Sequence, residues 1–353
     1  MENAVRKRLY SLDLLKLISI LIVFLYHILM DMYVIHPMHN LKFLETIIIR
    51  PNVHLAMLAC GVFILISGAT LKLNERNESV LSFYKRRLMK ILIPFYFAYI
   101  IYFIIKAVTL KNIHLFGGIE KWRFVYTIFG MDEYLNAAGI KTFTLGIGEW
   151  FLGCIILCYL VYPILSYFDK KYKLTTFIIF TIYDIFINIY YHRFNFVMPQ
   201  HFNFLCQVYN FYLGIAIIDD RIFEKLKKCR ILGILIVLFI YFCSFIINIP
   251  DNIKITLCAV SLVVVFYNFE NLIINNSFIL EPIRKFSVIS FEFFLVHHFV
   301  IYEIDYLLNY RRVGGVEFLV IVLIELAIII LISIWINKLN KLCNKFMDKC
   351  HNQ

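Results

Sequence analysis

The sequence has no C-x-x-C pair, no low-complexity tract and no internal repeat of the kind found in transporters. Its nine cysteines are scattered. Six of them fall inside apolar runs: Cys60, Cys154, Cys158, Cys206, Cys243 and Cys258. A structural metal site or a disulfide framework would need more regular cysteine spacing. We therefore infer neither a metal nor a disulfide, and we interpret these six residues as buried apolar side chains.

The sequence also lacks the features of a cleaved signal peptide. The first apolar run, about residues 10–32, is longer than an h-region, contains charged residues and has no small-residue cleavage site. It is predicted to remain in the protein as a membrane helix.

Apolar residues are abundant instead. They make up 61% of the 353 residues, and the mean hydropathy is +0.78, whereas soluble domains are roughly 45–50% apolar. Only an integral membrane protein fits this composition, so we predict an all-α polytopic helix bundle in the cell (plasma or inner) membrane. The net charge of +11 comes mainly from loops between apolar runs. It therefore indicates topology and contact with membrane lipid, and we expect no nucleic acid partner.

Apolar windows predict ten transmembrane helices in a single domain spanning 1–353. The windows cover about 10–32, 51–72, 89–109, 145–167, 174–192, 203–218, 231–249, 253–270, 287–308 and 316–337. An even number places both termini on one side, where the loops carry more than twice as many Lys and Arg residues. The positive-inside rule then predicts that both termini are cytoplasmic. The longest outer loop, roughly 110–144, is expected to include a short interfacial segment.

The first predicted span carries three ionisable residues, although each costs free energy in hydrocarbon. Lys16 and His27 are eleven positions apart, so on an α-helix their directions differ by only about 20°. They share one face, separated by about 16 Å, and Asp13 lies about 60° from Lys16. A snorkelling lysine or a packed histidine would explain either residue alone. Together they favour a polar pathway or site within the membrane, with His27 as the natural general base.

The pattern from Leu12 to Lys16, followed by His27 after ten residues, resembles the first-helix signature of the acyltransferase-3 family of multi-pass membrane O-acyltransferases. Four further segments resemble the family in the same order. They are GVFILISGATL (residues 61–71), FYKRRLMKILIPF (83–95), GEWFLGCIILCYLVYP (148–163) and SFEFFLVHHFVI (290–301). The resemblance covers nearly the whole chain, and ten spans suit the family. Ser67 and Gly68 in the first of these segments are expected to allow close helix packing.

The resemblance implies a coenzyme A thioester, acetyl-CoA or another acyl-CoA, as the acyl donor, with no metal cofactor. Arg86, Arg87 and Lys90 lie at the expected cytoplasmic start of the third span. Their charges suit the phosphates of the donor, and they also suit topology and anionic lipid. Lys16 is expected to bind the donor or to pair with Asp13.

We interpret His27, Lys16, Glu149 and His297 as candidate catalytic residues. His27 either takes the proton of the acceptor hydroxyl or carries the acyl group itself. Glu149, at the outer start of the fourth span, is expected to orient His27. His297 and His298 point about 100° apart, and the family likeness selects His297.

Trp150 and Asp13 are the candidate substrate-binding residues. Trp150 is either an interfacial anchor, or a sugar-stacking platform or wall of the acceptor site. The expected acceptor is a hydroxyl of a cell-surface polysaccharide or a lipid-linked glycan precursor. No appended extracytoplasmic domain is expected, so either the acceptor is acylated directly or a partner protein completes the transfer.

Two other functions remain open at this point. Ten helices with an internal polar stripe also suit a transporter or flippase of a lipid-linked sugar, or a non-catalytic component of a surface-glycan assembly complex. The expected partners are a carbohydrate, the thioester, membrane lipid, and either a second copy in a homo-oligomer or surface-glycan assembly proteins.

Overall fold

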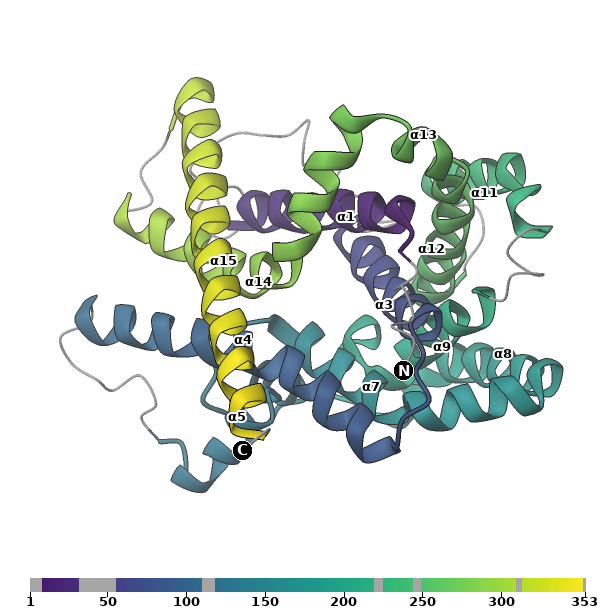
Figure 1. Ribbon diagram of the computed structural model, residues 1–353, viewed down its shortest axis with the longest axis horizontal. Helices are drawn as coiled ribbons and strands as arrows, with labels where there is room; N and C mark the ends of the chain where they lie inside the picture. Colours follow the sequence, from purple (N-terminus) through teal and green to yellow (C-terminus); the bar gives the residue numbers. More distant parts are fainter. Residues whose placement is uncertain are drawn as a thin grey trace. The chain divides into compact units, whose positions relative to one another are not determined.

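A computed structural model describes residues 8–31, 55–109, 118–218, 225–243, 249–308 and 313–351. Within these residues every regular element is a helix, and no strand occurs (Figure 1). This confirms the predicted all-α class. Long apolar runs favour helices in a membrane because a helix satisfies its own backbone hydrogen bonds.

Each of the ten predicted spans corresponds to a helix. The helices are α1 (Tyr10–Leu29), α3 (Leu55–Leu73), α4 (Val80–Thr109), α7 (Glu149–Lys171), α8 (Lys173–Tyr190), α9 (Phe204–Ile217), α11 (Arg230–Cys243), α12 (Asp251–Tyr267), α14 (Ser277–Leu307) and α15 (Gly315–His351). Seven described helices are long and apolar enough to cross a membrane, whereas α9, α11 and α12 are shorter. Parts of the predicted spans, residues 32, 51–54 and 244–248, lie outside the described residues. The count of ten and the cytoplasmic termini therefore stay predictions.

The predicted starts of two spans are wrong. Helix α4 begins at Val80 rather than near residue 89, and α14 begins at Ser277 rather than near residue 287. An apolar window marks only the membrane part of a helix. Arg and Lys are good helix formers, so each helix extends through its charged end before the apolar run begins.

The long loop between α4 and α7, which is predicted to be the outer loop, contains three short helices among its described residues. They are η2 (Lys121–Arg123), α5 (Phe124–Ile128) and α6 (Asp132–Ala137). The loop is tied to α4 by two tyrosine hydroxyls. Tyr99 donates to the carbonyl of Phe143 over 2.9 Å, and Tyr96 donates to the carbonyl of Ile128. These two hydrogen bonds hold the residues that precede the fourth span against α4.

The chain forms two compact units. Unit 1 comprises Met1–Val23, Thr46–Tyr84 and Cys154–Ser287; unit 2 comprises Phe24–Glu45, Lys85–Gly153 and Val288–Gln353. Helices α1, α4, α7 and α14 contribute residues to both.

The core of unit 1 is built on helices α3, α9 and α12, with α8 against α9 and α11 against α12. Small residues allow α3 and α9 to approach closely. A Cβ at Gly68 would overlap the carbonyl oxygen of Phe211, and a Cβ at Gly214 would overlap that of Leu65. The expected packing role of Gly68 is confirmed.

Polar side chains in unit 1 satisfy one another. Asn188 donates to the carboxylate of Asp184 over 2.8 Å, and its own amide oxygen accepts from Gln200 (2.9 Å) and Asn252 (3.1 Å). Asp184, Asn188 and Asn252 are all buried. A buried polar group that lacks a partner is destabilising, so a complete network is the expected solution.

The cysteines behave as apolar residues. Cys60, Cys154, Cys158, Cys206 and Cys258 are buried, as the sequence predicts. The side chain of Cys243 lies outside what the structure describes.

We predict that Gly68→Ala destabilises unit 1, because the added methyl group would meet backbone rather than a movable side chain. The free energy of unfolding should fall by about 1–3 kcal/mol, measured as a lower thermal midpoint in detergent. Gly314→Ala is the matched control, since a Cβ at Gly314 meets nothing within 4 Å. Equal midpoints for Gly68→Ala and wild type would contradict the close approach.

Candidate active site

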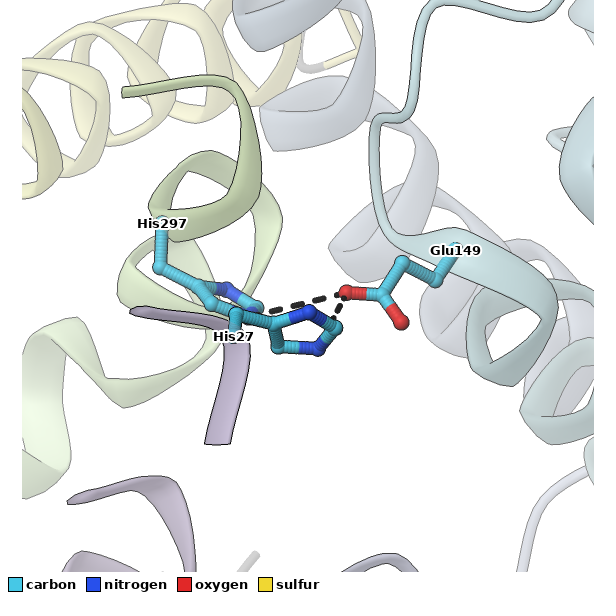
Figure 2. Close-up of side chains that lie close together, drawn as sticks. All are labelled: His27, Glu149 and His297. Atoms are coloured by element: carbon cyan, nitrogen blue, oxygen red, sulfur yellow. Dashed lines mark ion pairs between the residues drawn. The ribbon is translucent and has the colours of Figure 1, made fainter. Parts of the chain in front are cut away.

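Three helices bring His27, Glu149 and His297 together inside unit 2. Nε2 of His27 lies 3.0 Å from Oε1 of Glu149, and Nε2 of His297 lies 3.6 Å from the same oxygen. Figure 2 shows both imidazoles directed towards this carboxylate, from α1, α14 and α7. The side chain of His297 is only 2% exposed, whereas those of His27 and Glu149 are 14% and 18% exposed. The pair His27–Glu149 is therefore partly accessible, and His297 supports it from the buried side.

His298 belongs to the same cluster, although sequence reasoning set it aside. Its Nδ1 lies 3.7 Å from Oε1 of Glu149, and its ring centroid is 4.5 Å from that of His27. Consecutive helical residues do diverge by about 100°. Here the carboxylate approaches between the two directions, so His297 and His298 both reach it.

A strained turn positions the carboxylate. Glu149, the first residue of α7, has φ +46, and Gly148 before it has φ +73. A non-glycine residue in this region costs of order 1 kcal/mol and is typical of functional sites. Glu133 on α6 accepts a hydrogen bond from the backbone N–H of Gly146, and thereby anchors the turn to the outer loop.

Aromatic rings hold the histidines in place. Phe293 lies edge-on to Phe24 and parallel to the ring of His297, with centroids 6.0 Å and 6.4 Å apart. On the other side of α14, the ring of His298 lies 4.5 Å from that of Tyr302. Packing against neighbouring aromatic rings therefore limits the orientations of both imidazoles.

Asp13 and Lys16 lie in unit 1, on the same helix as His27. Asp13 pairs with Arg8 over 2.6 Å and accepts a hydrogen bond from Ser287 over 2.9 Å. Nζ of Lys16 is 4.0 Å from the carboxylate of Asp13. The structure therefore pairs Lys16 with Asp13, one of the two arrangements expected, and their roles in binding substrate stay predictions.

The other predicted site residues lie in unit 2. Arg86, Arg87 and Lys90 occupy the first part of α4, where Arg87 is buried and Lys90 is exposed. The indole of Trp150 is 6% exposed and lies edge-on to Phe151. Trp150 is therefore part of the packed interior beside Glu149, and its contact with an acceptor stays a prediction.

The cluster has the composition of a metal site as well as of an acid–base site. The potential ligand atoms of His27, Glu149 and His297 all lie within 4.8 Å of one another. In the described part of the chain, no other group of three or more His, Cys, Asp or Glu side chains has this spacing.

Comparison with known proteins identifies one family. A family model described as an acyltransferase domain matches residues 9–338, nearly the whole chain. No curated protein and no solved structure matches the chain.

The carboxyl that anchors the strained turn should make stability depend on pH. Burial raises the pKa of Glu133 from 4.5 to about 7; the Gly146 N–H lowers it, whereas the negative charges of Glu149 and Asp132 raise it further. The folded state thus binds this proton more tightly than the unfolded state, so stability is lost as pH rises from 4.5 towards 7 and above. We predict that Glu133→Gln, which retains the acceptor for Gly146, unfolds at a higher temperature than wild type at pH 8 but not at pH 4.

The control is Glu120→Gln, since Glu120 is an exposed carboxylate of the same outer loop. Thermal unfolding in detergent across this pH range measures both variants. A Glu133→Gln advantage that is equal at both pH values would contradict a titrating carboxyl.

Proposed function

The chain belongs to the acyltransferase-3 family, and we propose from this premise that it is a multi-pass membrane O-acyltransferase. It moves an acyl group, acetyl in the simplest case, from a cytoplasmic coenzyme A thioester to a hydroxyl of a surface polysaccharide or a lipid-linked glycan precursor. The observation that carries the proposal is the 3.0 Å contact between Nε2 of His27 and the carboxylate of Glu149. This contact supplies an oriented imidazole within an acyltransferase domain.

The contact supports Nδ1 of His27 as the base. A neutral imidazole donates through one nitrogen and accepts through the other. In this proposal the neutral ring carries its proton on Nε2, the nitrogen 3.0 Å from Oε1 of Glu149, so the lone pair is on Nδ1. The side chain of His27 is 14% exposed. Nδ1 is therefore the atom that can receive a substrate proton.

The reaction then proceeds with balanced proton transfer. Nδ1 takes the proton of the acceptor hydroxyl as its oxygen attacks the thioester carbonyl. The tetrahedral intermediate collapses, the C–S bond breaks, and the thiolate of coenzyme A leaves. The imidazolium of His27 returns its proton to the thiolate. Glu149 stabilises the imidazolium and holds the ring in the productive tautomer, as a carboxylate does for a catalytic histidine in many hydrolases.

The basic start of α4 supports the assignment of the donor. Arg86 and Lys90 offer cationic groups of the kind that bind phosphate oxygens, and Arg87 is positioned by burial. In this proposal they bind the nucleotide end of the thioester, and membrane lipid competes for the same charges.

We predict that His27→Ala lowers the rate of acyl transfer by about 10²-fold or more, the usual contribution of a general base. The assay follows coenzyme A release and incorporation of labelled acetyl groups into surface glycans by the purified chain in liposomes. Glu149→Gln should also lower kcat, because the amide does not stabilise the imidazolium.

The control is His192→Gln, at an exposed histidine of unit 1. If His27→Ala transferred acyl groups at the wild-type rate while remaining folded, the assignment of the base would be wrong. The cellular counterpart is O-acetyl on surface glycans in a strain that lacks the chain. Unchanged O-acetylation there would count against the acceptor class.

For the donor, we predict that the double variant Arg86→Gln/Lys90→Gln raises KM for the thioester by about tenfold and leaves kcat near wild type, because uniform binding is lost. Its KM should also depend less on salt concentration. Lys171→Gln, an exposed lysine at the end of α7, is the matched control. A double variant with wild-type KM would place the phosphate contacts elsewhere.

A further inference from the structure

One oxygen atom, Oε1 of Glu149, faces three imidazole nitrogens. They are Nε2 of His27 at 3.0 Å, Nε2 of His297 at 3.6 Å and Nδ1 of His298 at 3.7 Å. Only the first distance is that of a hydrogen bond. Figure 2 shows the carboxylate on one side of the neighbouring rings of His27 and His297. The nitrogens of His297 and His298 lie too far from this oxygen to share a proton with it.

The tautomer of His297 directs a nitrogen lone pair towards Glu149. Its Nδ1 lies 2.8 Å from the carbonyl oxygen of Phe294. A carbonyl only accepts, so Nδ1 carries the proton and Nε2 of the neutral ring presents a lone pair to Glu149. Nε2 of His297, Nδ1 of His298 and Oε1 of Glu149 are buried and have no conventional hydrogen-bond partner. Lone pairs that face one another repel, and a bound cation would relieve that repulsion.

The types of the three ligand atoms indicate which class of metal ion would bind. Two imidazole nitrogens and a glutamate oxygen form the ligand set of open tetrahedral zinc sites, in which metal–ligand bonds are about 2.0–2.2 Å. Ligands arranged around such an ion lie about 3–4 Å apart. The two Nε2 atoms lie 3.0 Å and 3.6 Å from Oε1, and all three atoms lie within 4.8 Å of one another. Ca²⁺ and Mg²⁺ prefer oxygen ligands. The backbone carbonyl that fixes Nδ1 of His297 is also the support that metal-bound histidines usually have.

We propose that His27, Glu149 and His297 form a binding site for one divalent transition-metal ion of the zinc class, and that this ion inhibits acyl transfer. The ligand atoms are the two Nε2 atoms and Oε1, and His298 can supply Nδ1 as a fourth. The binding part stands on geometry alone, whereas the inhibitory part rests on the proposed function. The ion is an inhibitor and not a cofactor of the reaction.

Inhibition follows from the proton on His27. Nε2 binds a metal ion only through its lone pair, so the Nε2 proton must leave that atom. The neutral ring then carries its proton on Nδ1, which becomes a donor and can no longer take the proton of an acceptor hydroxyl. The metal also neutralises Glu149, and so removes the charge that stabilises the imidazolium.

Binding is tested with Co²⁺, whose visible d–d absorption reports its coordination. The full-length chain is purified in detergent without a histidine tag, treated with a chelator and desalted. We expect one Co²⁺ per chain, with an affinity lowered at least about tenfold in His297→Gln and in Glu149→Gln. His192→Gln, at an exposed histidine outside the cluster, should bind as wild type does. Thermal unfolding confirms that each variant is folded.

Co²⁺ absorption that is absent in wild type, or unchanged in both ligand variants, would overturn the site. A sulfur-to-cobalt charge-transfer band would assign the ion to the exposed Cys229 or to Cys343, and would also overturn it. These outcomes do not depend on whether the chain transfers acyl groups. A failure of the proposed function is therefore distinguishable from a failure of the metal site.

Inhibition is tested with Zn²⁺ in the acyl-transfer assay, with Mg²⁺ as the control ion. Zn²⁺ should abolish transfer at concentrations at which Mg²⁺ has no effect, and a chelator should restore it. His297→Gln, compared with its own activity in the absence of zinc, should need at least about tenfold more Zn²⁺ for half-inhibition. Transfer that persists when Co²⁺ or Zn²⁺ fills the site would overturn the inhibitory part.

Discussion

The contact of one carboxylate with three imidazoles is the constraint on which the architecture of unit 2 depends. Glu149 lies at the start of an apolar helix, where a lone carboxylate would lose its hydration without compensation. Nε2 of His27 lies within hydrogen-bond distance of this carboxylate, whereas Nε2 of His297 and Nδ1 of His298 lie 3.6 Å and 3.7 Å from it. The left-handed backbone of Glu149 and the Glu133–Gly146 bond are means of placing this single oxygen.

Two groups of buried polar side chains, one in each unit, differ in their hydrogen bonding. In unit 1, amides and the carboxylate of Asp184 form a closed hydrogen-bond network with Asn188, and glycines let helices α3 and α9 pack through their backbones. That arrangement favours rigidity. In unit 2, the cluster around Glu149 retains buried nitrogen and oxygen atoms without hydrogen-bond partners. Atoms of this kind suit a group that arrives and leaves, such as a proton, an acyl acceptor or a metal ion.

The same cluster suits both the proposed catalysis and the proposed metal binding. An oriented imidazole needs a hydrogen bond at one nitrogen and a lone pair at the other. A ligand set for zinc needs lone pairs that converge on one point. Three histidines around one glutamate satisfy both requirements, and the position of a single proton on His27 decides between them.

Most of the helices could be predicted from the sequence, because the length and hydropathy of an apolar run determine whether it forms a membrane helix. The helix ends could not be predicted in this way. Charged residues such as Arg86 and Arg284 continue α4 and α14 beyond their apolar windows. The short helices of the outer loop carry no comparable apolar signal.

The sequence by itself determined the helical class, the ionisable residues placed inside apolar helices, and the likeness that selected His27 and His297. Periodicity within one helix settles which residues share a face, but not which face a neighbouring helix presents to it. Only the tertiary structure decided that Glu149 reaches both histidines and that His298 joins them. These outcomes depend on the rotation and offset of separate helices, which packing across distant parts of the chain sets.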